Sequence, residues 1–571
     1  MRGSPLIHEV NTWVWLDRWQ RRWQRRWQPR WQPRWQQRLQ RRSHDRDGHG
    51  AAQQQQQEPA DSPGAERDVD LGSLPEEALD ELTGLKRLRG GQYDAVWLMG
   101  VWERSPAARS LARRHPEVRA ECQRVLPDLS DADLCGSPYA VHGYRVDPAL
   151  GGDAALDRLR ARLLQRGVAL ILDLVPNHVA LDHPWLLSHP DAFVRGSEAA
   201  LREHPEAYFR HPLSGEIFAH GRDPHFPPWT DTAQVDAQSP VYRGLLIETL
   251  RQLTARCDGV RCDMAMLLVR GVFERTWEGS RDPRRRGAVR DDTPTPETLA
   301  TTELWPEVIA AVRGRGGREG APRFLFLAEV YWDMEAELQA MGFDLTYDKR
   351  LYDRLRGDSP GAVRDHLLAD AGYQARSLRF IENHDEPRAN TALSGRRGLA
   401  AAVLALTLPG GRLVHDGQAA GLRLRLPVQL GRGPDEAVDP PDPEVEALYA
   451  RLLPALARPV FHDGTYLALG SRPLYGDDVV ARGLIAHAWQ LGDELFVVAV
   501  NYGREPLRAR LLLPPLPSGR YRLTDVLHDD VAPERSADEL RIAGLEILLD
   551  PFAAHLFRVD ALPPSELGTR A

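Results

Sequence analysis

The chain of 571 residues is poor in the features that mark several protein classes. Its four cysteines (Cys122, Cys135, Cys257 and Cys262) show neither the spacing of a metal site nor the disulfide framework of a secreted protein. No window reaches about 18 uninterrupted apolar residues, so no membrane span is expected. The first residues contain no apolar run of the signal-peptide type, and we expect a cytoplasmic protein. A transmembrane bundle, a collagen-like chain and a disulfide-rich mini-protein are thereby excluded.

Lysine is also scarce, because Lys86 and Lys349 are the only two in the chain. Arginine supplies nearly all of the positive charge, and its distribution is uneven. Residues 18–42 contain ten arginines and no acidic residue, while the net charge of the whole chain is −8. The remainder therefore carries −18, which leaves 18–42 as the one basic segment.

This basic segment is a four-residue repeat with tryptophan at positions 19, 23, 27, 31 and 35, and five glutamines follow at 53–57. A helix with a tryptophan stripe is one interpretation, although Pro29 and Pro33 would break it. A nucleic-acid-binding arm is a second, since arginine neutralises phosphates and tryptophan stacks on bases. We favour a low-complexity insertion over 17–69, because no other basic patch supports binding to nucleic acid.

The rest of the chain alternates short apolar runs with amphipathic stretches. A β-branched and aromatic run at 6–16 indicates a strand before the repeat. Further apolar runs of the kind found in buried parallel strands occupy 93–101, 168–175, 258–263, 324–330, 378–381 and 402–408. Amphipathic helical segments such as 153–166 and 241–255 separate them. This alternation predicts an α/β fold, a (β/α)8 TIM barrel.

Two regions depart from the barrel rhythm. Residues 179–240 are rich in histidine, proline and aspartate, and we expect a small irregular domain there, after the third strand. From about residue 456 the pattern changes to short alternating strands separated by turns, which predicts a C-terminal antiparallel β-sandwich. We therefore divide the chain into a catalytic barrel at 1–455, interrupted by 17–69 and 179–240, and a sandwich at 456–571.

Residues capable of chemistry follow four of the apolar runs, in the segments 173–178, 259–263, 327–332 and 380–385. Side chains two apart on a strand share a face, so Arg261 and Asp263 should point together into the barrel, and Asn383 and Asp385 should also share a face. Because an adjacent arginine favours the charged carboxylate, we expect Asp263 to be ionised and available as a nucleophile.

Glu329 is the carboxylate at the end of the segment 327–332, and most of the residues around it in the sequence are apolar. Burial there would raise its pKa and make it a proton donor. Two carboxylates with divergent environments are typical of the acid and nucleophile in sugar hydrolysis. Asp385 supplies a third carboxylate, and His178 and His384 offer hydrogen bonds to sugar hydroxyls. Each segment alone is more often structural, but four in order at strand ends are specific.

Together, the motifs D-x-V-x-N-H, G-x-R-x-D, a strand-end glutamate and N-H-D resemble glycoside hydrolase family 13, the α-amylase family. The resemblance implies a (β/α)8 barrel, a small domain after strand three and a C-terminal sandwich. It also implies roles for residues of this chain: Asp263 as nucleophile, Glu329 as general acid/base and Asp385 as the third carboxylate. Substrate-binding positions are implied for Tyr139, Asp173, His178, Arg261, Asn383 and His384. In a retaining enzyme the two reacting carboxyl groups lie about 5–5.5 Å apart.

Departures from the family pattern limit which activity is expected. The residues after Asp263 are apolar (Met-Ala-Met-Leu-Leu), whereas many endo-acting amylases carry Lys-His there, so a long-starch endo-amylase is disfavoured. Asn177 matches a calcium-binding position without a convincing partner set, and we expect no cofactor and no metal, calcium included. We expect a retaining α-glycosidase acting on α-glucosides or α-glucan oligosaccharides. A transglycosylase or glucoside isomerase of the maltosyltransferase or trehalose-synthase type, and a binding protein on an inactive barrel, are the alternatives.

Overall fold

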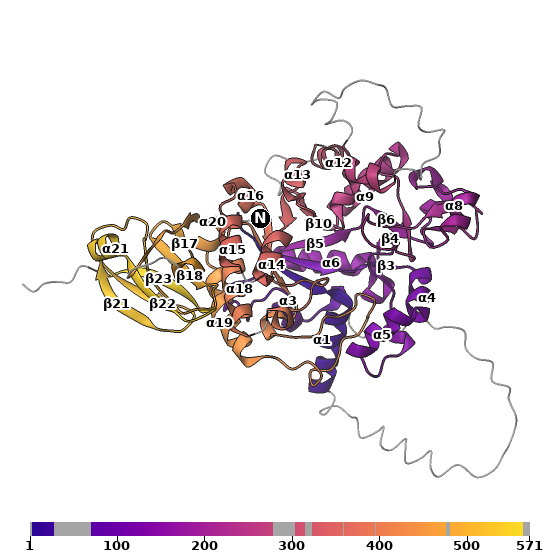
Figure 1. The fold of residues 1–571 in the computed structure, drawn as a ribbon. Helices are drawn as coiled ribbons and strands as arrows, with labels where there is room; N and C mark the ends of the chain where they lie inside the picture. Colours follow the sequence, from indigo (N-terminus) through magenta and orange to yellow (C-terminus); the bar gives the residue numbers. More distant parts are fainter. Residues whose placement is uncertain are drawn as a thin grey trace, which may run out of the picture.

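The computed structural model describes residues 3–27, 70–277, 303–314, 323–357, 359–393, 395–474 and 480–563, and its centre is a closed barrel of eight parallel strands (Figure 1). Around the barrel the strands follow one another in chain order, each paired in parallel with its neighbours. They are β1 (Leu6–Asn11), β2 (Ala95–Met99), β5 (Ala169–Leu174), β10 (Gly259–Cys262), β11 (Leu325–Ala328), β12 (Leu345–Tyr347), β13 (Ser377–Arg379) and β14 (Gly411–His415). The predicted (β/α)8 barrel is confirmed.

The last predicted barrel strand was wrong. Residues 402–408 belong largely to helix α18 (Arg396–Thr407), and the eighth strand is β14. An apolar run does not distinguish a buried strand from a buried helix. Here every side chain from Ala400 to Thr407 is buried, and the alanines in the run favour a helix. Strand β12 was missed because it has only three residues.

The first strand is also shorter than predicted, because it ends at Asn11 and helix α1 (Thr12–Trp27) follows directly. The side-chain oxygen of Asn11 accepts a hydrogen bond from the amide of Val14 (3.3 Å), which satisfies a free donor at the start of the helix. Trp13 and Trp15 are therefore helical, and the predicted boundary at residue 17 falls inside α1. The rest of the proposed 17–69 insertion, residues 28–69 with both prolines and the glutamines, lies outside the described residues.

Three arginines of the tryptophan repeat form ion pairs with acidic residues elsewhere in the chain. Arg18 lies 2.5 Å from Asp416, Arg21 lies 2.8 Å from Asp435, and Arg22 lies 2.6 Å from Glu81. These contacts attach α1 to the barrel wall. This part of the basic segment thus belongs to the folded barrel.

Helices fill the connections between barrel strands and cover their outer faces (Figure 1). Several begin at a Ser-Pro pair: the hydroxyl of Ser105 accepts the amide of Ala108 (2.9 Å), and Ser239 does the same for Tyr242 (3.4 Å). The helices of the barrel region are α3 (Glu76–Leu82), α4 (Pro106–Arg114), α5 (Pro116–Val125), α6 (Gly152–Gln165), α9 (Pro240–Thr254), α10 (Arg270–Thr276), α12 (Leu304–Arg313), α13 (Glu335–Ala340), α14 (Lys349–Arg356), α15 (Pro360–Leu367), α16 (Ala371–Ala375), α17 (Ala389–Ala392), α18 and α19 (Pro443–Leu456).

The region after the third barrel strand forms small antiparallel sheets. Strand β6 (His178–Ala180) pairs with β9 (Thr232–Gln234), and β7 (Tyr208–Arg210) pairs with β8 (Ile217–Ala219). The short helices α7 (Trp185–Ser188) and α8 (Glu198–Glu203) complete it. A further pair, β3 (Trp102–Arg104) with β4 (Val141–Val146), lies beside it in the connection after β2.

The C-terminal region contains two antiparallel sheets, as predicted. Six strands in the order β15-β17-β18-β23-β20-β21 form one sheet, and β16, β19 and β22 form the other. Between them lies a shared apolar core, while Trp489 and Phe496 on the outer face of the larger sheet pack with barrel helices. The elements are α20 (Val460–Asp463), β15 (Thr465–Ala468), β16 (Ser471–Pro473), β17 (Leu484–Leu491), β18 (Glu494–Asn501), β19 (Leu507–Leu511), β20 (Arg520–Asp525), β21 (Val531–Ser536), α21 (Ala537–Ala543), β22 (Leu545–Leu549) and β23 (Ala554–Ala561).

The helices of the described residues do not include a candidate for a membrane span. Within the described ranges, none combines the length and the apolar character that crossing a bilayer requires.

Candidate active site

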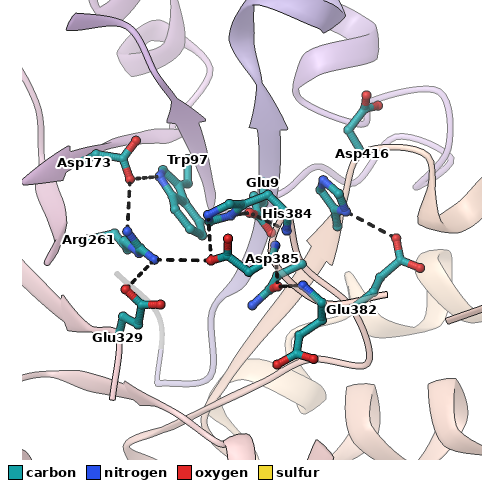
Figure 2. A network of polar contacts seen from close by, with 12 residues as sticks. Glu9, Trp97, Asp173, Arg261, Glu329, Glu382, His384, Asp385 and Asp416 are labelled. Atoms are coloured by element: carbon teal, nitrogen blue, oxygen red, sulfur yellow. Dashed lines mark hydrogen bonds and ion pairs between the residues drawn. The ribbon is translucent and has the colours of Figure 1, made fainter. Parts of the chain in front are cut away.

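Polar side chains from four barrel strands converge at the carboxyl ends of those strands (Figure 2). Asp173 lies on β5 and Arg261 on the neighbouring β10, at paired positions of the sheet. Asp263 and Glu329 follow the last residues of β10 and β11, and Asp385 lies in the loop after β13. This is the end of a parallel barrel at which loops and strand ends build active sites.

The Arg261 side chain, which is fully buried, lies at the centre of this group. Its Nη1 lies 2.7 Å from Oδ1 of Asp263, and its Nη2 lies 2.8 Å from Oε2 of Glu329. The carboxylates of Asp173 and Asp385 are farther away, at 3.8 and 4.0 Å. Nη1 donates a hydrogen bond to Asp263, whereas the contact between Nη2 and Glu329 is an ion pair without hydrogen-bond geometry.

Glu329 is held by two further hydrogen bonds. Its Oε2 accepts the backbone amide of Met264 (2.7 Å), and its Oε1 accepts the hydroxyl of Tyr331 (2.7 Å). Burial, together with the negative charges of Asp263 and Asp385, raises the pKa of Glu329 to about 7 against the opposing charge of Arg261. This is the direction that its apolar sequence context predicts. A carboxyl group with such a pKa can donate a proton near neutral pH.

Asp263 differs in part from the sequence-based expectation. Its contact with Arg261 is present, but the net shift of its pKa is upward, because burial of the carboxylate outweighs the favourable charge of the arginine. Oδ1 accepts the hydrogen bond from Arg261. The next residue, Met264, has a positive φ of 43°, so the chain turns sharply after Asp263 in a conformation that costs energy for a non-glycine residue.

Asp385 is the exposed member of the three carboxylates, with 41% of its side chain accessible. Its Oδ2 lies 2.9 Å from Nε2 of His384, whose Nδ1 lies 2.5 Å from Oε1 of Glu9. Although burial opposes it, His384 lowers the pKa of Asp385 to about 2. Burial likewise opposes protonation of His384, yet Asp385 and Glu9 raise its pKa to about 10. At neutral pH the site therefore holds an ionised Asp385 beside an imidazolium.

Two other predicted residues adjoin this centre. The ring of Tyr139 lies 5.3 Å from the guanidinium carbon of Arg261, and its hydroxyl lies 2.6 Å from Nε2 of His384. His178 is buried with its ring 4.9 Å from that of Trp229. Burial lowers the pKa of His178 to about 4, so a neutral imidazole is present at pH 7.

Asp173 and Asn383 form hydrogen bonds with groups at or after the strand ends. Asp173 accepts hydrogen bonds from the indole of Trp97 (3.1 Å) and from the amide of Gly100 (3.1 Å). Asn383 does not share a strand face with Asp385, because β13 ends at Arg379 and both residues lie in the loop beyond it. Instead, its side-chain oxygen accepts the amide of Asp385 (3.0 Å). Asn383 thus orders the loop that carries the third carboxylate.

Four residues of the site were missed at the level of sequence: Glu9, Trp97, Tyr331 and Tyr347. Glu9 and Trp97 lie in barrel strands read only as apolar runs; a buried acid in the run Leu-Ile-His-Glu-Val was a usable signal. Tyr331 follows Glu329 closely, but nothing in the sequence gives the direction of its hydroxyl. Tyr347, whose hydroxyl lies 3.3 Å from Nε of Arg261, belongs to the missed strand β12.

The position matched to calcium binding does not fit the ion. Carbonyl and carboxylate oxygens bind calcium. The side-chain oxygen of Asn177 instead accepts a hydrogen bond from the amide of Gln234 (3.0 Å), and its nitrogen lies 3.3 Å from the oxygen of that amide. The two amides satisfy each other.

Comparison with known proteins places this geometry in context. No family model matches the chain. Over 414 residues it is 26% identical to the α-amylase MalA of Haloarcula japonica, an alignment that covers 67% of this chain. The chain spans about half (52%) of that relative's length.

Solved structures with the same fold include a maltogenic α-amylase, AmyB, from Thermotoga neapolitana, with a TM-score of 0.56 and 19% identity over 85% of this chain and 94% of that one. The α-amylase of Geobacillus thermoleovorans, solved with acarbose, has a TM-score of 0.56 and 18% identity over 98% and 99% of the two chains. The shared fold is a closed parallel barrel, and in this chain it carries carboxylates at the carboxyl ends of its strands. The chain is thus similar in sequence to one α-amylase and shares the fold of solved α-amylases.

Proposed function

We propose that the chain is a retaining α-glycosidase that acts on α-glucosides or α-glucan oligosaccharides through a covalent glycosyl-enzyme. The barrel region at 1–455 would carry the reaction, with the sandwich at 456–571 as an accessory domain. The observation that supports this most is the pair Asp263 and Glu329 on the two terminal nitrogens of Arg261. Two carboxyl groups held on one rigid donor, one of them protonated near neutral pH, are what double displacement requires.

In the first step Glu329 donates its proton to the glycosidic oxygen while Asp263 attacks the anomeric carbon. Oδ1 of Asp263 is held by Arg261, which leaves Oδ2 for the attack. The bond to the leaving sugar breaks as the ester bond to Asp263 forms. Ionised Asp385 accepts hydrogen bonds from hydroxyl groups of the reacting ring, and protonated His384, whose Nε2 lies 2.9 Å from it, favours its charged form.

In the second step Glu329, now a carboxylate, removes a proton from water, and that water attacks the anomeric carbon. The ester to Asp263 breaks and the anomeric configuration is retained. Asp263 and Glu329 return to their starting protonation states. The Tyr331 hydroxyl and the Met264 amide each donate a hydrogen bond to one oxygen of Glu329, and together they fix the orientation of its carboxyl group.

A panel of α-linked glucosides and maltooligosaccharides, assayed with wild type and Glu329→Gln, tests this function. For poor leaving groups we expect turnover by Glu329→Gln to fall by about 10²–10⁴-fold, because general acid catalysis is lost. An activated substrate such as an α-glucosyl fluoride needs little protonation and should still glycosylate the variant. Wild-type inactivity on the whole panel, or equal loss on both substrate types, would contradict the proposal.

Transfer to a sugar acceptor is a second candidate, and Trp332 supports it. This tryptophan lies three residues after the proton donor and is 39% exposed, with its ring 4.9 Å from that of His225. Trp332 and Asp333 both have a positive φ, 61° and 62°, a rare conformation for such residues that is found at functional sites. An exposed indole three residues after the proposed proton donor offers a stacking surface for an acceptor sugar.

Product analysis separates transfer from hydrolysis. With maltooligosaccharides and glucose as a second sugar, we expect Trp332→Ala to lower the ratio of transfer to hydrolysis products at least several-fold. The matched control is Leu164→Ala, an exposed apolar side chain on α6. If wild type forms no transfer product, or if the ratio is unchanged in Trp332→Ala, Trp332 is not an acceptor platform.

A further inference from the structure

A histidine–aspartate cluster in the C-terminal region lies far along the chain from the barrel carboxylates. Asp525 ends strand β20, and its side chain is almost entirely buried. Its Oδ1 accepts the backbone amides of Leu527 (3.0 Å) and Leu556 (3.2 Å). These two hydrogen bonds fix the carboxylate and leave Oδ2 directed away from the backbone.

Two imidazoles approach that second oxygen. Nδ1 of His528, in the turn after β20, lies 2.7 Å from Oδ2 of Asp525, and Nδ1 of His555, on β23, lies 2.5 Å from the same atom. Strands β20 and β23 are paired, so the three residues are held by the sheet and by one tight turn. Within the described ranges, this is the one group of three or more histidine, cysteine, aspartate or glutamate ligand atoms that lie within 4.8 Å of one another.

The hydrogen bonding of His555 indicates whether a proton or a cation lies between its Nδ1 and the carboxylate of Asp525. Its Nε2 is 3.3 Å from the carbonyl oxygen of Leu548, and a carbonyl can only accept a hydrogen bond. Nε2 therefore carries the proton of a neutral ring, and the lone pair of Nδ1 faces the carboxylate of Asp525. The lone pair of Nδ1 and the carboxylate oxygen are both hydrogen-bond acceptors, and at 2.5 Å they repel each other unless a cation or an extra proton lies between them. Donation of the other ring N–H to a backbone carbonyl is also the usual arrangement of a metal-binding histidine.

We infer that Asp525, His528 and His555 bind a zinc ion through one carboxylate oxygen and two imidazole nitrogens. Two nitrogens and one oxygen form a donor set that suits zinc, whereas calcium requires oxygen ligands. Tetrahedral coordination at about 2.0–2.2 Å requires the ligand atoms to separate to about 3.3 Å. His528, 51% exposed, is free to make most of that movement, while Asp525 stays fixed by its backbone contacts.

Access and a fourth ligand are available on the His528 side. His528 borders a cavity of about 270 Å³ between α18 and the C-terminal sheet, which is also lined by Arg396, Leu399 and Phe552. Water in this cavity can complete the coordination. The bound ion would join the turn after β20 to strand β23, next to the junction with the barrel. This role is structural and does not depend on the proposed glycosidase activity.

Calorimetric titration of the metal-depleted full chain with zinc chloride tests the inference, with thermal unfolding as a second readout. We expect about one zinc per chain and a rise in Tm of a few degrees, because an ion that binds only the folded state stabilises it. Calcium chloride should give neither effect. His528→Gln should lose stoichiometric binding and the rise in Tm, and its exposed position makes misfolding an unsuitable explanation for the loss.

The matched control is His204→Gln, which removes a histidine that is 63% exposed and distant in sequence, and which should bind zinc as wild type does. Asp525→Asn and His555→Gln extend the test to the buried ligands. Absence of stoichiometric zinc binding in wild type would overturn the inference, because it would show that Asp525, His528 and His555 are held together by hydrogen bonds alone. Zinc binding that persists unchanged in His528→Gln, or an equal effect of calcium, would also overturn the inference.

Discussion

Two of the arginines that barrel strands bury completely, Arg261 and Arg379, differ in their surroundings. Arg261 on β10 has four carboxylates within 4.0 Å, whereas Arg379 on β13 has one, Asp348. The remaining donors of Arg379 contact neutral oxygens of Pro409 and Gln374. The first group has an excess of negative charge and one member open to solvent; the second is balanced and enclosed.

The pKa values follow this difference in charge balance. Burial lowers the pKa of Arg379 to about 9, and a distant tyrosine offers little opposition. Burial acts on Arg261 in the same direction, but the surrounding carboxylates, Glu329 foremost, raise its pKa well above the ordinary value. The excess charge also raises the pKa of Glu329. A buried arginine alone therefore does not mark an active site, whereas an arginine shared by competing carboxylates favours one.

The largest expected effect comes from removing Asp263, the proposed nucleophile. Asp263→Asn should lower turnover by more than about 10⁴-fold, because no covalent intermediate can form. We expect its Tm to equal or exceed that of wild type, since one of several competing carboxylates is neutralised and Arg261 keeps Glu329. Steady-state kinetics and thermal unfolding measure both. The control Asp157→Asn, an exposed residue on α6, should change neither, and a large fall in Tm of Asp263→Asn would refute the idea of excess charge.

The next effect is on stability. Asp348→Asn should destabilise the fold by about 3–5 kcal/mol, because it leaves Arg379 buried without its counter-ion. Asparagine can still accept the amide of Leu351 at the start of α14, so loss of that cap does not explain the result. Denaturant unfolding gives the free energy. Folded Asp348→Asn should keep near-native turnover below its unfolding temperature; a stable but inactive variant would mean that the Arg379 group takes part in the chemistry.

The smallest effect is on pH dependence. Glu329 must be protonated to donate, and its pKa is about 7, so kcat/KM should fall as the pH rises above that value. Asp385 contributes to this raised pKa, and Asp385→Asn should therefore shift the alkaline limb of the residual activity to lower pH. Stability gives a check on the sign. The folded state holds this proton between about 4.5 and about 7, so the contribution of Glu329 to the free energy of unfolding falls as pH rises through that range. An alkaline limb unchanged by Asp385→Asn would contradict the coupling.

Sequence reasoning succeeded where one residue type and its spacing carry the information. Asp263 directly follows β10, two residues after Arg261, and their contact agrees with that spacing. It failed where backbone direction changes: Asn383 and Asp385 lie beyond the end of β13, and Trp13 and Trp15 lie in a helix that begins after only six residues of strand. At neither of these strand ends does the sequence mark the change of direction with a glycine or a proline.

Long-range contacts were the other limit. Glu9 and His384 are 375 positions apart in the chain, and only closure of the barrel brings β1 beside β14 and places Glu9 next to the loop after β13. The pKa of Asp263 likewise depends on how much burial outweighs Arg261, which a neighbouring arginine in the sequence does not determine. The spacing of two residues in the sequence predicts whether their side chains meet on one strand. The protonation state of a buried carboxyl group, in contrast, can be predicted only when all of its neighbours in the fold are known.

Trapping the glycosyl-enzyme tests the central claim most directly. Glu329→Gln should react with an α-glucosyl fluoride in the first step and then accumulate the intermediate, because no base assists the second. Intact-mass spectrometry followed by peptide mapping should find one added glucosyl unit, attached to Asp263. An adduct on another residue, or the absence of any adduct while the substrate is consumed, would contradict the assignment of Asp263 as the nucleophile of a retaining enzyme.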